Sequence, residues 1–151
     1  MRLDDLVLDH PVPHVHLRFH EELGRTLKTR GSERKVPLVG IALWGAQRAV
    51  EAARSARSAS GWLFPRYAAD HNIRSTHAAN TANKWLKRLL KDTKTTHSFR
   101  HAMRDRLRRV NAPEELADRV GGWGTRTVGM GYGEEDRLKQ IKAHLEKIVL
   151  A

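Results

Sequence analysis

The spacing of apolar residues along this 151-residue chain changes near Gly40, and this change limits the folds that are open to it. Before Gly40, the segment HVHLRF (14–19) alternates in the period-2 pattern that is typical of a half-buried strand. After Gly40, apolar residues recur every three or four positions, as in helices that bury one face. We therefore expect one α+β domain that is mostly helical, with a small antiparallel sheet near the N-terminus.

The predicted sheet has three antiparallel strands, near residues 14–19, 25–29 and 34–38. Segment 24–40 predicts a hairpin, because RTLKT and RKVPL flank a turn at Gly31 and Ser32. Pro37 suits the end or edge of a strand, since it has no backbone N–H. The segment WLFPRY (62–67) is expected to be short and extended.

Five helices are expected, over residues 41–56, 75–91, 96–111, 114–120 and 134–150. The first has apolar residues at helical spacing (Ile41, Trp44, Ala49 and Ala52). The second is expected to be capped by Ser75 or Thr76 and to bury Ala78, Ala82, Trp85, Leu86 and Leu89. The third has a stripe of Phe99, Met103, Leu107 and Val110. The fourth begins after Pro113 and stops at Gly121–Gly122, and the fifth has a stripe of Leu138, Ile141, Leu145 and Ile148.

The charge balance indicates the kind of partner. The chain has 28 Lys and Arg against 17 Asp and Glu, a net charge of +11, which suits a polyanion, and nucleic acid is the favoured one. A ribosomal-type or merely basic protein is an alternative. An acidic membrane fits less well, because the basic residues are spread over several segments.

The chain contains no cysteine, which excludes disulfides, thiolate nucleophiles and cysteine-ligated zinc and fits a reducing cytoplasm. No apolar run approaches the roughly 20 residues that span a bilayer. The N-terminus has no signal-peptide pattern, so a cytoplasmic, DNA-associated protein is expected.

Three pairs of the form His-x-x-Arg occur: His71–Arg74, His97–Arg100 and His101–Arg104. Trp123 lies 23 residues after Arg100, and Tyr132 lies nine residues further, within the glycine-rich segment GGWGTRTVGMGYG. The same distances counted from the other two arginines do not reach a tyrosine, and the chain has only 2 tyrosines. The spacing therefore selects the pair at 97 and 100.

This arrangement resembles the catalytic signature of the tyrosine recombinases, the phage integrase family. A second stretch, TLKTRGSERKVPL (26–38), is similar to the family's hairpin, in which a lysine before the turn enters the active site. Lys28 occupies that position. The stretches RLDDLVLD and WLFPRY also resemble family sequence in the expected order, so the resemblance covers nearly the whole chain.

The resemblance implies that Tyr132 attacks a DNA phosphodiester, forming a 3′-phosphotyrosine link and freeing a 5′-hydroxyl. His97 would act as base or hydrogen-bond partner of the tyrosine, and Arg100 would stabilise charge on the phosphate. Lys28 would protonate the leaving oxygen, and Trp123 would offer its indole N–H and a packing surface. Because the phosphotyrosine stores the bond energy, neither a metal nor a nucleotide cofactor is implied. Four further residues are expected to contact double-stranded DNA: Arg25, Arg30, Arg34 and Lys94.

The family pattern also contains an earlier arginine on a helix, and this sequence has no counterpart to it. We expect a single C-terminal catalytic domain over 1–151 that lacks this helix and the N-terminal DNA-clamping domain. Such a chain should bind DNA but cleave it slowly or not at all, since loss of one transition-state donor typically costs about two or three orders of magnitude. We expect a monomer in free solution and a tetramer of the full-length protein on DNA. Helix 134–150 would either mediate that contact or close its own core, and exchange between protomers on DNA is the favoured of the two.

Other interpretations are open. Taken singly, His97 and Arg100 suit a solvated helix surface, Trp123 suits a core, and Lys28 suits a phosphate contact without proton transfer. A topoisomerase of the same chemistry, or a non-catalytic DNA-binding module, would use a similar basic surface. A metal nuclease is disfavoured because the sequence presents no obvious carboxylate cluster, and DDLVLD (4–9) is interpreted as the acidic entry to a strand.

Overall fold

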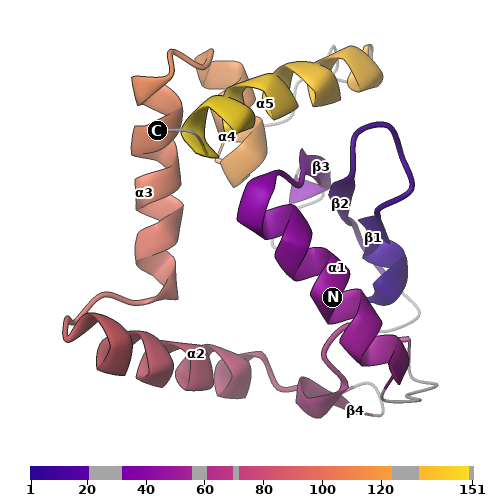
Figure 1. Ribbon diagram of the computed structural model, residues 1–151, viewed down its shortest axis with the longest axis vertical. Coiled ribbons are helices and arrows are strands. Elements are labelled where there is room, and N and C mark those ends of the chain that lie inside the picture. Colours follow the sequence, from indigo (N-terminus) through magenta and orange to yellow (C-terminus); the bar gives the residue numbers. More distant parts are fainter. Residues whose placement is uncertain (21–31, 56–60, 70–71, 124–132, 150–151) are drawn as a thin grey trace.

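The structure, a computed structural model, describes residues 1–20, 32–55, 61–69, 72–123 and 133–149. These residues form five α-helices and a small three-stranded antiparallel sheet (Figure 1), so the expected α+β class is confirmed. The helices are α1 (Gly40–Ser55), α2 (Ser75–Leu90), α3 (Thr96–Arg109), α4 (Glu114–Gly121) and α5 (Glu134–Val149). None of the described helices is long and apolar enough to cross a membrane.

The three-stranded sheet has the order β1–β2–β3, from Leu6–Val7, His14–Leu17 and Arg34–Pro37. A 3₁₀ turn, η1 (Leu3–Asp5), leads into β1. The predictions of strands near 14–19 and 34–38 are confirmed with shorter bounds, whereas the predicted strand 25–29 lies outside the described residues. The remaining strand of the three-stranded sheet is β1, which the sequence did not predict because two residues are too few to show a period of two.

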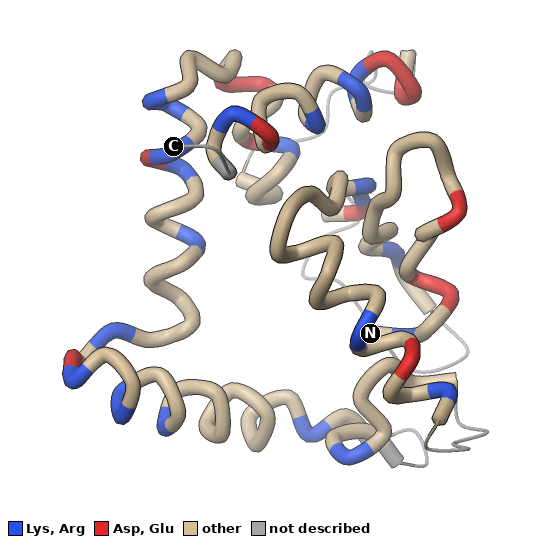
Figure 2. The backbone as a smooth tube through the Cα atoms, viewed as in Figure 1, with Lys and Arg blue, Asp and Glu red and all other residues tan. Residues whose placement is uncertain are grey.

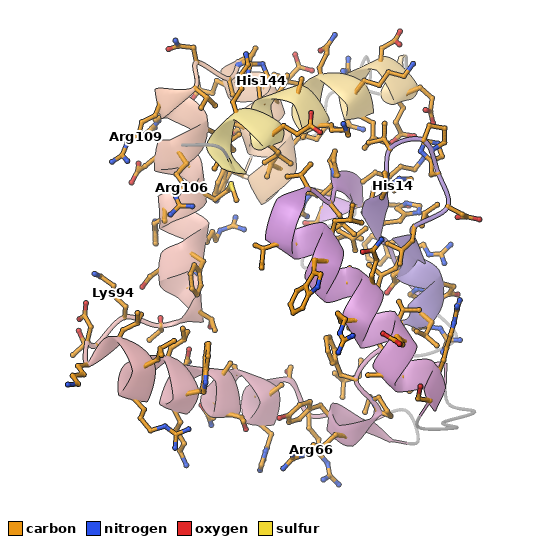
Figure 3. The ribbon with its side chains drawn as sticks, viewed as in Figure 1. His14, Arg66, Lys94, Arg106, Arg109 and His144 are labelled. Carbon is orange, nitrogen blue, oxygen red and sulfur yellow. The ribbon has the colours of Figure 1, made fainter. Side chains whose placement is uncertain are left out.

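The pairing of β2 with β3 brings the first residue of one opposite the last residue of the other, His14 opposite Pro37. Pro37 ends its strand, as its missing N–H predicts. His14 is buried (Figure 3), and its Nδ1 lies 2.8 Å from the carbonyl oxygen of Val12. Burial lowers the pKa of His14, which favours its neutral form.

The sequence suggested that the segment WLFPRY is extended, and this is wrong for its second half. Pro65–Tyr67 forms a 3₁₀ turn, η4, in which Pro65 supplies the fixed φ of a first helical position. A two-stranded sheet of β4 (Ala68–Ala69) and β5 (Asn72–Ile73) follows, and Trp62 pairs with Arg2 in an isolated bridge.

The main hydrophobic core lies between α3, α4 and α5, which pack against one another. Leu107 and Ile141 are both 1% exposed at its centre. All four residues of the predicted α5 stripe are buried, three of them in this cluster (Ile141, Leu145 and Ile148). Helix α5 therefore packs against its own chain, and a contact of this helix with a second protomer on DNA stays a prediction.

Two predictions for α2 are wrong. Its N-cap is Arg74 and not Ser75 or Thr76. Of the five residues predicted to be buried on its apolar face, Leu86 alone is fully buried. Trp85 is 54% exposed and Leu89 is 60% exposed. The physical reason is the position of the helix: α2 runs along the periphery (Figure 1) and meets η4 and α3 near its two ends, so no described element lies against most of its length.

The same holds for other apolar residues that the helical period marks. On α1, Ile41 is 79% exposed and Trp44 is also exposed, whereas Val50 and Ala53 are the buried residues. On α3, Phe99 is exposed although Leu107 on the same stripe is buried. An apolar period predicts a helix correctly but does not say which part of its stripe finds a partner.

Candidate functional site

Arg100 lies on the second turn of α3 and reaches the end of α4. Its Nη1 donates a hydrogen bond of 2.6 Å to the carbonyl oxygen of Gly121, and its guanidinium carbon lies 4.9 Å from the centre of the Trp123 ring. The second distance is within the range of a cation–π contact. Two residues that the sequence linked only through their separation are therefore in contact.

The turn that carries Trp123 depends on two glycines. Gly122 has φ +63° and ends α4, and the N–H of Trp123 bonds back to the carbonyl oxygen of Asp118 at 3.0 Å. A Cβ on Gly121 would lie 2.3 Å from the Trp123 ring, too close for any side chain. The ring therefore folds back onto the helix end, as the predicted stop at Gly121–Gly122 allows.

Arg34, at the start of β3, covers the same turn. A Cβ on Gly122 would lie 2.6 Å from Arg34 Nη1, so the guanidinium sits directly on the glycine. Arg34 Nη1 also donates a 2.8 Å hydrogen bond to the carbonyl oxygen of Ser32. Burial, followed by the positive charge of Arg100, lowers the pKa of Arg34.

Arg104 is a third cation at this turn, and the sequence analysis did not select it. Its guanidinium carbon lies 5.2 Å from the Trp123 ring centre. Unlike its neighbour one turn earlier, it pairs with acids of α4, at 3.7 Å from Glu114 and 3.8 Å from Asp118. One feature of the sequence could have identified Arg104: it lies four residues after Arg100, and this spacing puts both arginines on one face of a helix.

His97 lies on the exposed surface of α3, one turn before Arg100. Its ring contacts the ring of His101 edge to face, with centroids 4.9 Å apart. The two His-x-x-Arg pairs of α3 are thus neighbours on one helix, and the structure does not separate them by distance alone. Only the spacing to the tyrosine does so.

Four of the predicted site residues lie outside the described residues: the catalytic candidates Lys28 and Tyr132, and the DNA-contact candidates Arg25 and Arg30. Lys94 is described, and it lies at the corner between α2 and α3 rather than at the Trp123 turn (Figure 3). Its Nζ is 2.9 Å from Asp92 Oδ2, a contact that lowers the pKa of Asp92.

The structure also brings together three possible metal ligands, Asp4, Asp5 and His20. The sequence does not show this cluster, because His20 is 15 residues from Asp5. In the fold, His20 Nε2 is 2.8 Å from Asp5 Oδ1, and Arg18 contacts both carboxylates at 3.3 Å and 3.6 Å. A guanidinium already lies against both acids, so this arrangement fits a structural ion-pair cluster rather than a cation site.

Positive charge is concentrated on the arm formed by α2 and α3 (Figure 2). Residues 75–109 contain ten Lys and Arg against two Asp and Glu, a balance of +8 within a chain total of +11. Arg100 belongs to this arm, and its contact with Trp123 connects the arm to the glycine-rich turn. A surface of this kind attracts polyanions and concentrates them at the arginine cluster.

Comparisons with protein-family models, curated proteins and solved structures found no match to this chain.

Proposed function

We propose that this chain cleaves and rejoins DNA strands by the chemistry of the tyrosine recombinases, acting in site-specific integration or excision. The observation that carries the proposal is the contact of Arg100 with Gly121 and Trp123. The resemblance implied that Arg100 and Trp123 share a site, although 23 positions separate them in the sequence. A chance match of residue types would not need to bring them into contact.

In the proposed reaction, Tyr132 attacks the phosphorus of a DNA phosphodiester. A covalent tyrosine–phosphate bond forms as the bond to the 5′-oxygen breaks. Tyrosine ordinarily has a pKa near 10, so His97 is proposed to accept its proton, and Lys28 is proposed to protonate the departing 5′-oxygen. Arg100 offers the charged N–H groups that a phosphate gaining negative charge needs.

The proposal has a DNA-binding part and a strand-cleavage part. Acting on DNA in the prokaryotic cytoplasm, the chain would be a monomer in free solution and part of a tetramer on DNA. The α2–α3 arm supports the DNA-binding part through its charge. The alternative, a DNA-binding module without turnover, would use the same arm and would not need Tyr132.

The test is covalent trapping on nicked duplex DNA in EDTA. The chain, Tyr132→Phe and Tyr67→Phe would be incubated with labelled DNA, denatured, and examined for a slower-migrating protein–DNA adduct. Tyr67, in η4, is the other tyrosine of the sequence and provides a matched control. We expect an adduct from the wild type and Tyr67→Phe, and none from Tyr132→Phe. DNA binding by all three without an adduct from any, even after long incubation, would favour the non-catalytic alternative.

A further inference from the structure

Arg34 and Arg100 converge on one turn from two different elements. Arg100, on α3, bonds to the carbonyl oxygen of Gly121, and Arg34, on β3, lies on the next residue, Gly122. The sequence suggested only that Arg34 was one of several basic contacts on a hairpin. The fold brings it instead to Gly122, between the two residues that Arg100 contacts.

The two guanidiniums have no counter-charge among the described residues. Arg104, at the same turn, is paired with Glu114 and Asp118, but Arg34 and Arg100 hydrogen-bond only to backbone carbonyl oxygens within the part of the chain that the structure describes. The segment that follows Trp123, residues 124–132, contains no Asp or Glu in its sequence. Two like charges held close together without an acid are unfavourable for the protein alone.

The donor inventory favours an anion at this place. A guanidinium carries five N–H donors, and each of these two makes one hydrogen bond to a carbonyl oxygen among the described residues. Arg34 Nε is buried with no hydrogen-bond partner, a costly state for a charged group. Arg100 is exposed, so a ligand from solvent can reach it, and Arg34 is half-buried.

We propose that Arg34 and Arg100 together bind a single phosphate group at the Gly121–Trp123 turn. Arg34 is then a second phosphate ligand of the site and not a peripheral DNA contact. A phosphate would turn the repulsion between the arginines into two attractions, and its oxygens suit the planar fork of each side chain. That this phosphate is the scissile one rests on the proposed function; the anion site itself does not.

The first arm of the test uses inorganic phosphate as the probe, at constant ionic strength. Phosphate is titrated into the ¹⁵N-labelled chain while the arginine Nε–H signals are followed by NMR. Arg34→Gln and Arg100→Gln remove one charge each, and Arg109→Gln is the matched control, because Arg109 points outward from α3 on the side away from α1 (Figure 3). We expect each of the first two variants to weaken phosphate binding about tenfold and the control to leave it unchanged.

The second arm uses a short duplex DNA and distinguishes a backbone phosphate from a free anion. Arg34→Gln should weaken DNA binding about tenfold at fixed salt and reduce the slope of log K against log salt by about one. Arg34→Lys, which keeps the charge but loses the fork, should recover part of the affinity. Matching circular dichroism spectra and melting temperatures would show that the variants are folded.

Each outcome decides one of the two ideas. Wild-type phosphate affinity in Arg34→Gln, or no phosphate binding by the wild-type chain, would overturn the two-arginine site. Normal adduct formation by Arg34→Gln would leave the proposed function intact and refute a role for Arg34 in it. Phosphate binding through both arginines, without any adduct from the wild type, would refute the proposed function and leave the anion site intact.

Discussion

Gly122 provides a quantitative test of how Arg34 is seated. Replacing Gly122 by alanine should lower the free energy of unfolding for two separate reasons. Alanine substitutions at two other glycines, Gly133 and Gly45, allow the two contributions to be measured apart. The first is the left-handed backbone, φ +63°, which an L-residue adopts at a cost of about 1–2 kcal/mol. The second is the displacement of Arg34, since the new Cβ would lie 2.6 Å from its Nη1.

The second cost should be modest, because a guanidinium at the end of a flexible side chain can move aside. What it loses is its hydrogen bond to the Ser32 carbonyl, worth about 0.5–1.5 kcal/mol. Gly133→Ala carries the first cost alone, with φ +72° and no atom near the new Cβ. Gly45→Ala carries neither, since it lies in α1 with open space around it, and should stabilise the chain by about 0.5–1 kcal/mol.

Urea denaturation gives the measurement, with free energies compared at a common slope. We expect Gly133→Ala to cost about 1–2 kcal/mol and Gly122→Ala to cost about 1 kcal/mol more, or roughly 2–4 °C of further decrease in Tm. In a chain that also carries Arg34→Ala, Gly122→Ala and Gly133→Ala should lower the free energy of unfolding by the same amount. If Gly122→Ala remained more destabilising than Gly133→Ala in the Arg34→Ala chain, the guanidinium would not be the cause of the difference. The position of Arg34 against Gly122 would then be wrong.

Two further predictions concern the core and the pH dependence. Leu107→Ala should lower the free energy of unfolding by about 2–5 kcal/mol, because Leu107 is 1% exposed between three helices; the exposed Leu89→Ala is the control, and equal costs would contradict the packing. Glu134 loses solvation by partial burial, but its hydrogen bond to Lys35 at 3.2 Å and the charge of Arg119 lower its pKa overall. Its contribution to stability should therefore be present above the ordinary glutamate pKa and disappear as the pH falls through the lower folded value. Glu134→Gln should cost less than about 1 kcal/mol at pH 7, given the exposure of the side chain, and nothing in strong acid; a cost that is constant with pH would refute the ion pair.

Local signals in the sequence predicted much of the fold. The i, i+3, i+7 stripe of α5 identified both the helix and its buried face, because that face meets two other helices of the same chain. Gly121–Gly122 correctly predicted the end of α4, since a left-handed residue can terminate a helix.

Sequence periodicity failed where tertiary contacts decide. Trp85 and Leu89 have the spacing of a core face, yet they are exposed because no described element packs along α2. β1 is too short to show any alternation, and its existence depends on pairing with β2.

For the candidate site, spacing selected Arg100 and Trp123, and these two are in contact. Spacing did not reveal Arg104 as a second cation at the ring, nor the seat of Arg34 on Gly122. Both depend on how α3 and β3 lie against the end of α4, which no local pattern encodes. Lys28 and Tyr132 remain predictions.

The uneven burial of the helices has a consequence for hydrogen exchange. Amides of α3, α4 and α5 surround the buried leucines and isoleucines and should exchange only through openings close to global unfolding. Helix α2 has one buried side chain, and α1 has two, so each can unwind at a smaller free-energy cost. Amides of α3, α4 and α5 would then exchange slowly, whereas those of α1 and α2 would exchange rapidly. The rapidly exchanging helices carry the most exposed tryptophans, Trp44 and Trp85.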